Sequence, residues 1–131
     1  MTTEIHLKRV YEAASPTDGA RVLVDRLWPR GVSKDRAALD SWAKEAAPST
    51  DLRQRWHADA DADKPSHFAR FTVEYQRELE QAPAADALER LVDLAREHSR
   101  LTLVYGARNE ATNHAVVLRE ALLSRLQMPP R

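Results

Sequence analysis

The chain has 131 residues, of which 43% are hydrophobic and 31% charged, and its 20 Lys and Arg residues balance its 20 Asp and Glu residues. This size and composition are typical of one soluble folded domain, so we predict a single domain over residues 1–131 with a short C-terminal tail at 127–131. The zero net charge argues against extended nucleic-acid binding, because that usually needs an uncompensated basic face.

The absence of cysteine excludes disulfides, thiolate catalysis and cysteine metal sites. No apolar run approaches the roughly 18 residues of a membrane span, and the first residues lack the apolar stretch of a signal peptide. We therefore expect a cytoplasmic protein that makes no use of a membrane, a metal or a cofactor. Asp59, Asp61 and Asp63 resemble a calcium-binding loop, but the Gly and Glu of that loop are missing, so we predict a solvated acidic loop.

Two strand-like stretches open the chain. "EIHLKRVY" over residues 4–11 alternates polar and apolar residues and predicts a first strand. "RVLVDRL" over residues 21–27 is nearly continuously apolar and predicts a buried second strand. Turn residues in "SPTDG" separate the two, and "WPRG" ends the second.

Helical spacing dominates the middle of the chain. Leu39, Trp42 and Ala46 share one face of a predicted helix that Pro48 ends. Further helices are predicted in "STDLRQRWH", around Phe68 to Leu79 and around Ala84 to Ala95. "LTLVY" over residues 101–105 predicts a third strand, and a last helix is expected from about Glu110 to Leu126.

This order of elements predicts an α/β domain with a small, mainly parallel sheet of three to four strands and helices packed on it. Ligands of open parallel sheets bind beyond the carboxyl ends of the strands. Here those ends are "DRLWPRG" and "GARNEATNH", so two polar stretches are expected to meet at one edge of the sheet.

The residue types at this edge suit the recognition of an anion. Guanidinium groups pair with carboxylate or phosphate, and the free N–H groups at the start of a helix add partial positive charge. Our first hypothesis is therefore a site for a small anionic or nucleotide-like ligand. The residues of that site would be Arg26, Trp28, Arg30, Arg108, Asn109 and Asn113, with Trp28 covering the ligand and His114 titrating beside it.

Two other functions fit the same residues, and the sequence leaves open whether the protein is an enzyme. In the first, His114 acts as a general acid or base with Asp25 in the hydrolysis of a phosphate or glycosidic bond. In the second, the cluster only braces a structural or protein-interaction module. The arginines then pair with Asp25 or Glu110, Asn109 caps the last helix, and Asn113 holds a loop carbonyl.

"LVDRLWPRG" and "LVYGARNEATNHAVVL" together resemble the short form of the family of domain of unknown function 488, an uncharacterised bacterial family. The stretches "KRVY", "SPTDGARVLVDRLWPRGVSK" and "APSTDLR" resemble the family pattern in the same order. The resemblance covers nearly the whole chain.

Two departures from the family pattern affect the functional interpretation. Short members typically read Tyr-Ala-Ala-Arg-Asp where this chain has Gly106 and Asn109 at the second and last positions, and Asn cannot carry the charge of Asp. Longer members tend to carry Cys near the third strand, and this chain has none, so thiol chemistry is not implied here. This second departure favours binding over catalysis.

Overall fold

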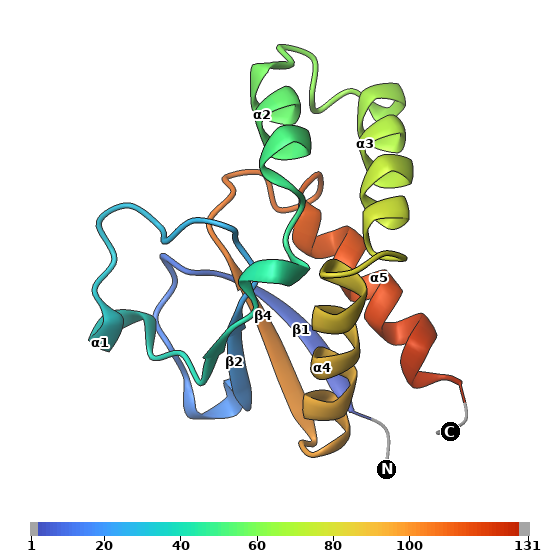
Figure 1. Cartoon of the computed structure of the whole chain (residues 1–131). Helices are drawn as coiled ribbons and strands as arrows, with labels where there is room; N and C mark the ends of the chain where they lie inside the picture. The colour runs from blue at the N-terminus through green and yellow to red at the C-terminus, as the bar shows by residue number, and fades with distance from the viewer. Residues whose placement is uncertain (1–2, 129–131) are drawn as a thin grey trace.

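A four-stranded, wholly parallel sheet forms the centre of the protein in the computed structural model, which describes residues 3–128 (Figure 1). Its order is β1-β4-β2-β3, and the strands are β1 (Glu4–Arg9), β2 (Ala20–Leu23), β3 (Ser41–Trp42) and β4 (Arg100–Tyr105). The α/β class and the parallel sheet are thus confirmed. Residues 129–131 of the expected tail lie outside the described residues.

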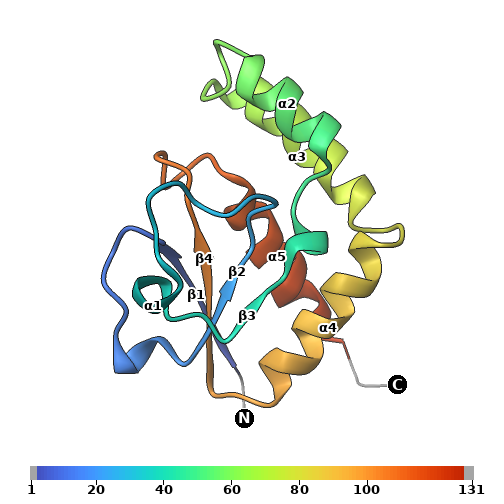
Figure 2. The same cartoon turned by 60° about the vertical axis from the view of Figure 1, so that its left-hand side comes forward.

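Helices cover both faces of this sheet, and a helical hairpin stands beyond its carboxyl edge (Figure 2). One face carries α4 (Ala84–Arg96) and α5 (His114–Leu126), and the other carries the single turn α1 (Lys34–Ala37) with its flanking loops. The hairpin consists of α2 (Thr50–Ala58) and α3 (Pro65–Glu78). Two short 3₁₀ helices, η1 (Pro16–Asp18) and η2 (Lys44–Ala46), lie in the connections.

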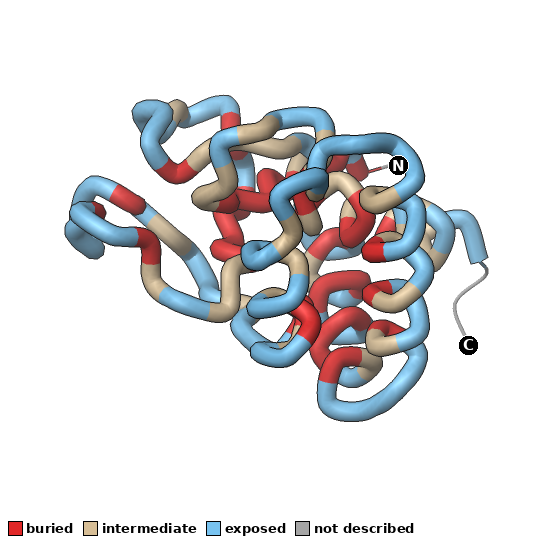
Figure 3. Tube along the Cα trace, turned by 90° about the horizontal axis from the view of Figure 1, so that it is seen from above, coloured by how far each residue is buried: buried red, intermediate tan, exposed pale blue. Residues whose placement is uncertain are grey.

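The main core lies between the sheet and the helices α4 and α5 and extends to the buried residues of α3. Figure 3 shows the buried residues gathered in the interior of the molecule. Strand side chains alternate between the two faces of a sheet, so Leu101, Leu103 and Tyr105 of β4 all reach this core. Val104 points to the opposite face, where a smaller cluster holds Val10, Val32 and Ala37. Burial on both faces explains why β2 and β4 are apolar almost throughout.

The helix predicted around Leu39, Trp42 and Ala46 is wrong. The chain instead forms the edge strand β3 followed by η2. Backbone pairing with β2 decides this, because the Asp40 N–H donates to the Arg21 carbonyl and the Ala43 N–H to the Leu23 carbonyl, each at 2.8 Å. The helical spacing of Leu39, Trp42 and Ala46 therefore does not reflect a helix, because pairing with β2 overrides the local preference of this segment.

Three predicted boundaries also shift. The last helix begins at His114 and not near Glu110, because the Asn109 side chain accepts the Ala111 and Thr112 N–H groups and holds a turn. His114 is therefore the first residue of α5. Strand β2 ends at residue 23 and β1 at residue 9, earlier than predicted.

A buried ion pair fixes the amino end of β2. Asp18 Oδ2 lies 2.6 Å from the Arg21 guanidinium, and Lys8 Nζ lies 3.1 Å from Asp18 Oδ1. Arg21 also donates to the carbonyls of Ala37 and Ala38, so it connects β2 to α1. Burial raises the pKa of Asp18, but hydrogen bonds from the Ser15 N–H, Lys8 and Arg21 outweigh that effect and lower the pKa.

We predict that Asp18→Ala lowers the free energy of unfolding by about 3 kcal/mol, because Arg21 would keep a buried charge without its partner. The depressed pKa of Asp18 means that this stabilisation is present above its unfolded pKa and is lost as the pH falls through its folded pKa. Urea unfolding at pH 7 and at about pH 3 measures both effects, since an unfolded Asp titrates near 3.9. If the free energies of unfolding of the unaltered protein and of Asp18→Ala differed by the same amount at both pH values, the ionic origin of the effect would be contradicted.

Candidate functional site

A cavity of about 400 Å³ lies at the carboxyl edge of the sheet. Its walls come from Tyr11 after β1, the loop after β2, the segment from Gly106 to the start of α5, and the α2–α3 hairpin with Pro48 before it. The residues that line it are Tyr11, Asp25, Arg26, Leu27, Trp28, Pro29, Arg30, Pro48, Arg53, Trp56, His57, Phe71, Gly106, Ala107, Asn113 and His114. The predicted edge of the sheet thus holds a cavity of ligand size.

Val24 and Asp25, the two residues that follow β2, connect the walls of the cavity, and Asp25 is one of its lining residues. Asp25 Oδ2 accepts the Gly106 N–H at 2.9 Å, which ties the loop after β2 to the loop after β4. The Asp25 carbonyl accepts the indole N–H of Trp42 at 2.7 Å, and the Val24 carbonyl lies 3.0 Å from His114 Nε2. β2, β3, β4 and α5 therefore meet at two consecutive residues.

The other carboxylate oxygen of Asp25 is buried and has no hydrogen-bond donor among the described residues. His114 Nε2 lies 3.1 Å from this Oδ1 atom, close enough for an ion pair. The ring nitrogen nevertheless meets hydrogen-bond geometry only with the Val24 carbonyl. A single ring N–H thus faces two acceptors and satisfies one of them.

The predicted arginines divide into structural and free groups. Arg26 lines the cavity, but its guanidinium donates to the carbonyls of Pro48 and Ala47 at 2.8 and 3.1 Å, and its Nη1 lies 3.9 Å from Glu45. Arg30 lines the cavity and is exposed; its carbonyl accepts the Tyr11 hydroxyl, and its side chain has no hydrogen-bond partner within residues 3–128. Arg108 is exposed and is not among the lining residues.

Arg53 of α2 is a cation that sequence reasoning missed. It lines the cavity, and within residues 3–128 its side chain makes no hydrogen bond or ion pair. His57, one helical turn along α2, lines the same cavity. Burial lowers the pKa of His57, the positive charges of Arg53 and His114 lower it further, and Asp25 opposes them.

The remaining predicted residues have structural partners. Asn113, and not Asn109, caps α5: its Oδ1 accepts the Val116 N–H, while its Nδ2 donates to the Asn109 carbonyl at 2.8 Å. Trp28 lines the cavity, donates its indole N–H to the Val32 carbonyl and packs edge-on against Trp42. Asn109 is not a lining residue.

The α2–α3 hairpin is held over the cavity at its base and at its tip. At the base, the buried Tyr75 hydroxyl donates to the Ala46 carbonyl at 2.6 Å, and Glu78 accepts both the N–H and the hydroxyl of Ser49. At the tip, the Thr112 hydroxyl donates to Asp63 at 2.9 Å. Arg53, Trp56 and His57 could have been found only by recognising that this hairpin folds over the sheet edge.

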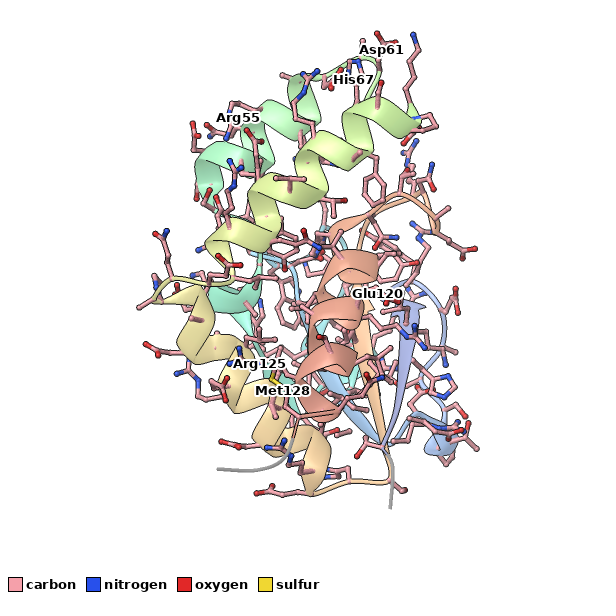
Figure 4. All side chains as sticks on the ribbon, turned by 90° about the vertical axis from the view of Figure 1, so that its right-hand side faces the viewer. Arg55, Asp61, His67, Glu120, Arg125 and Met128 are labelled. Carbon is pink, nitrogen blue, oxygen red and sulfur yellow. The ribbon has the colours of Figure 1, made fainter. Side chains whose placement is uncertain are left out.

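The acidic stretch predicted as a solvated loop lies at the tip of the hairpin (Figure 4). Asp59 lies 2.7 Å from His67 Nδ1, and Asp61 forms an exposed ion pair with Lys64. Among residues 3–128, no three His, Asp or Glu side chains gather as the ligands of a metal ion would. None of the helices in that range combines the length and the apolarity that crossing a membrane requires.

Gly106 sets the position of the Asp25 carboxylate. A Cβ atom at residue 106 would lie 2.9 Å from Asp25 Oδ2, so Gly106→Ala must displace the carboxylate or the loop. We expect a loss of roughly 1–3 kcal/mol in the free energy of unfolding, as is usual for overpacking. Chemical denaturation measures the loss, and the amide proton shift of residue 106 reports its hydrogen bond. Unchanged stability would mean that the carboxylate is not held by this contact.

The chain is similar over most of its length to bacterial proteins. It is 45% identical over 120 residues to "Uncharacterized protein YeaO" of Escherichia coli, covering 92% of this chain and 97% of that protein. It is 39% identical over 123 residues to "Uncharacterized protein Rv3073c" of Mycobacterium tuberculosis, covering 94% and 97%. No solved structure gives a significant match. A family model described as "Inactive DUF488-N3 subclade" matches residues 4–129, and the chain therefore belongs to the family of domain of unknown function 488.

Proposed function

We propose that this protein binds a small anionic ligand, of nucleotide-like size, in the cavity at the carboxyl edge of its sheet. The observation that carries the proposal is the presence of two guanidinium groups, those of Arg53 and Arg30, that line the cavity without an acidic partner among the described residues. A guanidinium group without a protein partner is suited to a bidentate contact with carboxylate or phosphate.

The charge of the lining favours an anion. Three arginines and two histidines line the cavity, and Asp25 is its only acidic residue within the described chain. One oxygen of Asp25 is already engaged by the Gly106 N–H. Asn113 and His114 bring the start of α5 to the same cavity, so the partial positive charge of a helix N-terminus adds to that of the side chains.

The size and the aromatic lining favour an organic anion over an inorganic one. A volume of about 400 Å³ falls in the range of small-molecule sites. Trp28 belongs to the sheet edge, while Trp56 and Phe71 belong to the hairpin, with ring centroids 4.5 Å apart. Such rings offer flat apolar surface for a planar part of a ligand.

A hydrolytic function is the second candidate, and one observation favours it. His114 Nε2 lies 3.1 Å from Asp25 Oδ1, which brings together a histidine and a carboxylate of the kind that acid–base catalysis uses. The description of the matching family model as an inactive subclade weighs against catalysis. We therefore place binding first. Turnover of a phosphate ester or a glycoside that is lost in His114→Ala would reverse this order.

A purely structural module would also use part of this cluster. Arg26, Trp28 and Asn113 all hold loop or helix groups, as that interpretation requires. It gives no role to Arg53, whose side chain makes no hydrogen bond or ion pair within residues 3–128.

Three arginine variants distinguish these functions. We expect Arg53→Gln to weaken binding of sulfate and of AMP about tenfold or more while leaving the thermal midpoint unchanged, because it removes a charged contact used only by the ligand. Arg26→Gln should lower the free energy of unfolding by roughly 1–3 kcal/mol, because two loop carbonyls lose their donor. Arg108→Gln, outside the cavity, should change neither. Isothermal titration calorimetry and thermal unfolding provide the two measurements.

No binding of sulfate or AMP by the unaltered protein would overturn the proposal. Equal losses in Arg53→Gln and Arg108→Gln would show that any binding is general attraction to the surface, not to this cavity.

We also expect sulfate binding to tighten as the pH falls from 8 to about 5.5. An anion beside His57 offsets the positive charges that lower the pKa of this residue, so binding raises that pKa and takes up a proton. Sulfate keeps its charge over this range, and the change therefore belongs to the protein. His57→Gln should remove most of the pH dependence, and an unchanged dependence in that variant would place the titrating group elsewhere.

A further inference from the structure

We propose that the anion bound in this cavity is a tetrahedral oxyanion, as in a phosphate monoester, and that α2 binds it with the Arg53 guanidinium, the His57 ring and the indole N–H of Trp56. This inference rests on the proposed function and adds to it the chemical class of the anionic group and a residue that recognises it. Its basis is a set of donors on one face of α2 that find no acceptor in the described protein.

The face of α2 toward the cavity carries donors without partners. Arg53, Trp56 and His57 line the cavity, and their spacing of three and four residues places them on one face of the helix. Within residues 3–128, none of these three side chains makes a hydrogen bond or an ion pair. Arg55 of the same helix, labelled in Figure 4, is by contrast paired with Glu74 at 3.1 Å. The arginine of α2 that lines the cavity is thus the unpaired one.

Trp56 is the exception among the three tryptophans. The indole N–H groups of Trp28 and Trp42 donate to the carbonyls of Val32 and Asp25, each at 2.7 Å. The indole N–H of Trp56, which can only donate, has no acceptor among the described residues. Its nitrogen retains accessible surface, because Asp25 Oδ1 is the one side-chain N or O atom of those residues that is both buried and unpartnered. This donor is therefore open to an acceptor from outside the protein.

The neighbours of Trp56 favour the ligand cavity as the place where its N–H is used. Trp56 also lines a smaller cavity of about 210 Å³ between α2 and α3. Asp59 and Glu74 line that smaller cavity, and their carboxylates are strong acceptors. The indole N–H bonds to neither of them, which favours an orientation toward the larger cavity. The ring of Phe71, with its centroid 4.5 Å from that of Trp56, packs against the indole and holds this orientation.

Donors from three side chains on one wall suit a phosphate better than a carboxylate. A guanidinium fork satisfies both oxygens of a carboxylate by itself. A phosphate group has three accepting oxygens, enough for a guanidinium, an imidazole N–H and an indole N–H together. Burial lowers the pKa of His57 and the charge of Arg53 lowers it further, so these two side chains are close to each other. A doubly charged anion beside both would offset their repulsion.

Nuclear magnetic resonance tests the indole contact on the unaltered protein, because three tryptophans give three indole N–H signals. Trp28→Phe and Trp42→Phe assign two of them, and the third belongs to Trp56. We expect the Trp56 signal to exchange with deuterium fastest in the free protein, to shift when sulfate or AMP is added, and to exchange more slowly at saturation. The Trp42 signal is the internal control, since its hydrogen bond to the Asp25 carbonyl is already present.

Two tryptophan variants separate binding from stability. Trp56→Phe removes the indole N–H and keeps a ring to pack against Phe71. We expect it to weaken sulfate and phenyl phosphate about tenfold or more, as the loss of a hydrogen bond to a charged group predicts, and thermal unfolding checks that it is folded. Trp42→Phe is the matched loss of an indole N–H outside the cavity lining. It should lower the thermal midpoint and keep the affinity.

Phenyl phosphate and phthalate test the class of the anion. At pH 8 each carries two negative charges and one benzene ring, but only phenyl phosphate has a tetrahedral anionic group. We expect phenyl phosphate to bind the unaltered protein about tenfold or more tightly than phthalate in calorimetric titrations, because it can accept from all three side chains at once. Trp56→Phe should reduce this preference.

The outcomes distinguish the inference from the function beneath it. If sulfate and AMP bind in an Arg53-dependent way while the Trp56 signal and the affinity of Trp56→Phe stay unchanged, the anion site stands and the indole contact is wrong. If phthalate binds as tightly as phenyl phosphate, the assignment to a tetrahedral anion is wrong. If sulfate, AMP and phenyl phosphate all fail to bind the unaltered protein, this inference and the proposed function are both overturned.

Discussion

The end of strand β2 is the constraint on which the rest of the site depends. Val24 and Asp25 receive hydrogen bonds from β4, from the edge strand β3 and from the first residue of α5. These elements are far apart in the sequence, and nothing local holds them together. The backbone pairing of β2 with β4 brings them to one edge, and the Asp25 carboxylate fixes the two loops that leave that edge. A change at Asp25 therefore alters the lining of the cavity and the packing of the sheet edge together.

The opposite wall of the cavity is positioned by a different set of contacts. The hairpin of α2 and α3 is anchored by Tyr75 and Glu78 to the segment from the end of η2 to Ser49, just before α2. Arg26 holds the carbonyls of this same segment from the sheet side. Arg26, which the sequence analysis assigned to a ligand, thus secures the base of the hairpin. Arg53 of α2 lines the cavity and has no hydrogen-bond or ion-pair partner for its side chain within residues 3–128.

Sequence patterns predicted the correct element in segments whose structure is decided by the burial of apolar side chains alone. β4 and the amphipathic helix α4 follow directly from their apolar periodicity, because burial alone decides their structure. The segment around Trp42 did not, because its spacing fits a helix while its backbone pairs with β2. The meeting of Asp25 and His114 was predictable from the rule for parallel sheets, which placed both at one edge. Arg53 and His57 were not, because their place depends on how a hairpin folds back over that edge.

The net charge of the chain conceals an uneven distribution of charges. Around the amino ends of β2 and β4, cations are matched with acids: Arg21 shares Asp18 with Lys8, which comes from the end of β1, and Arg100 pairs with Glu4. At the carboxyl edge, by contrast, arginines outnumber acids in the lining of the cavity. Because these acids are paired with cations elsewhere, the electrostatic potential at the carboxyl edge is positive. A partly enclosed cavity concentrates such a potential more than an open surface does. The zero net charge of the chain therefore does not describe the local charge of this edge of the sheet.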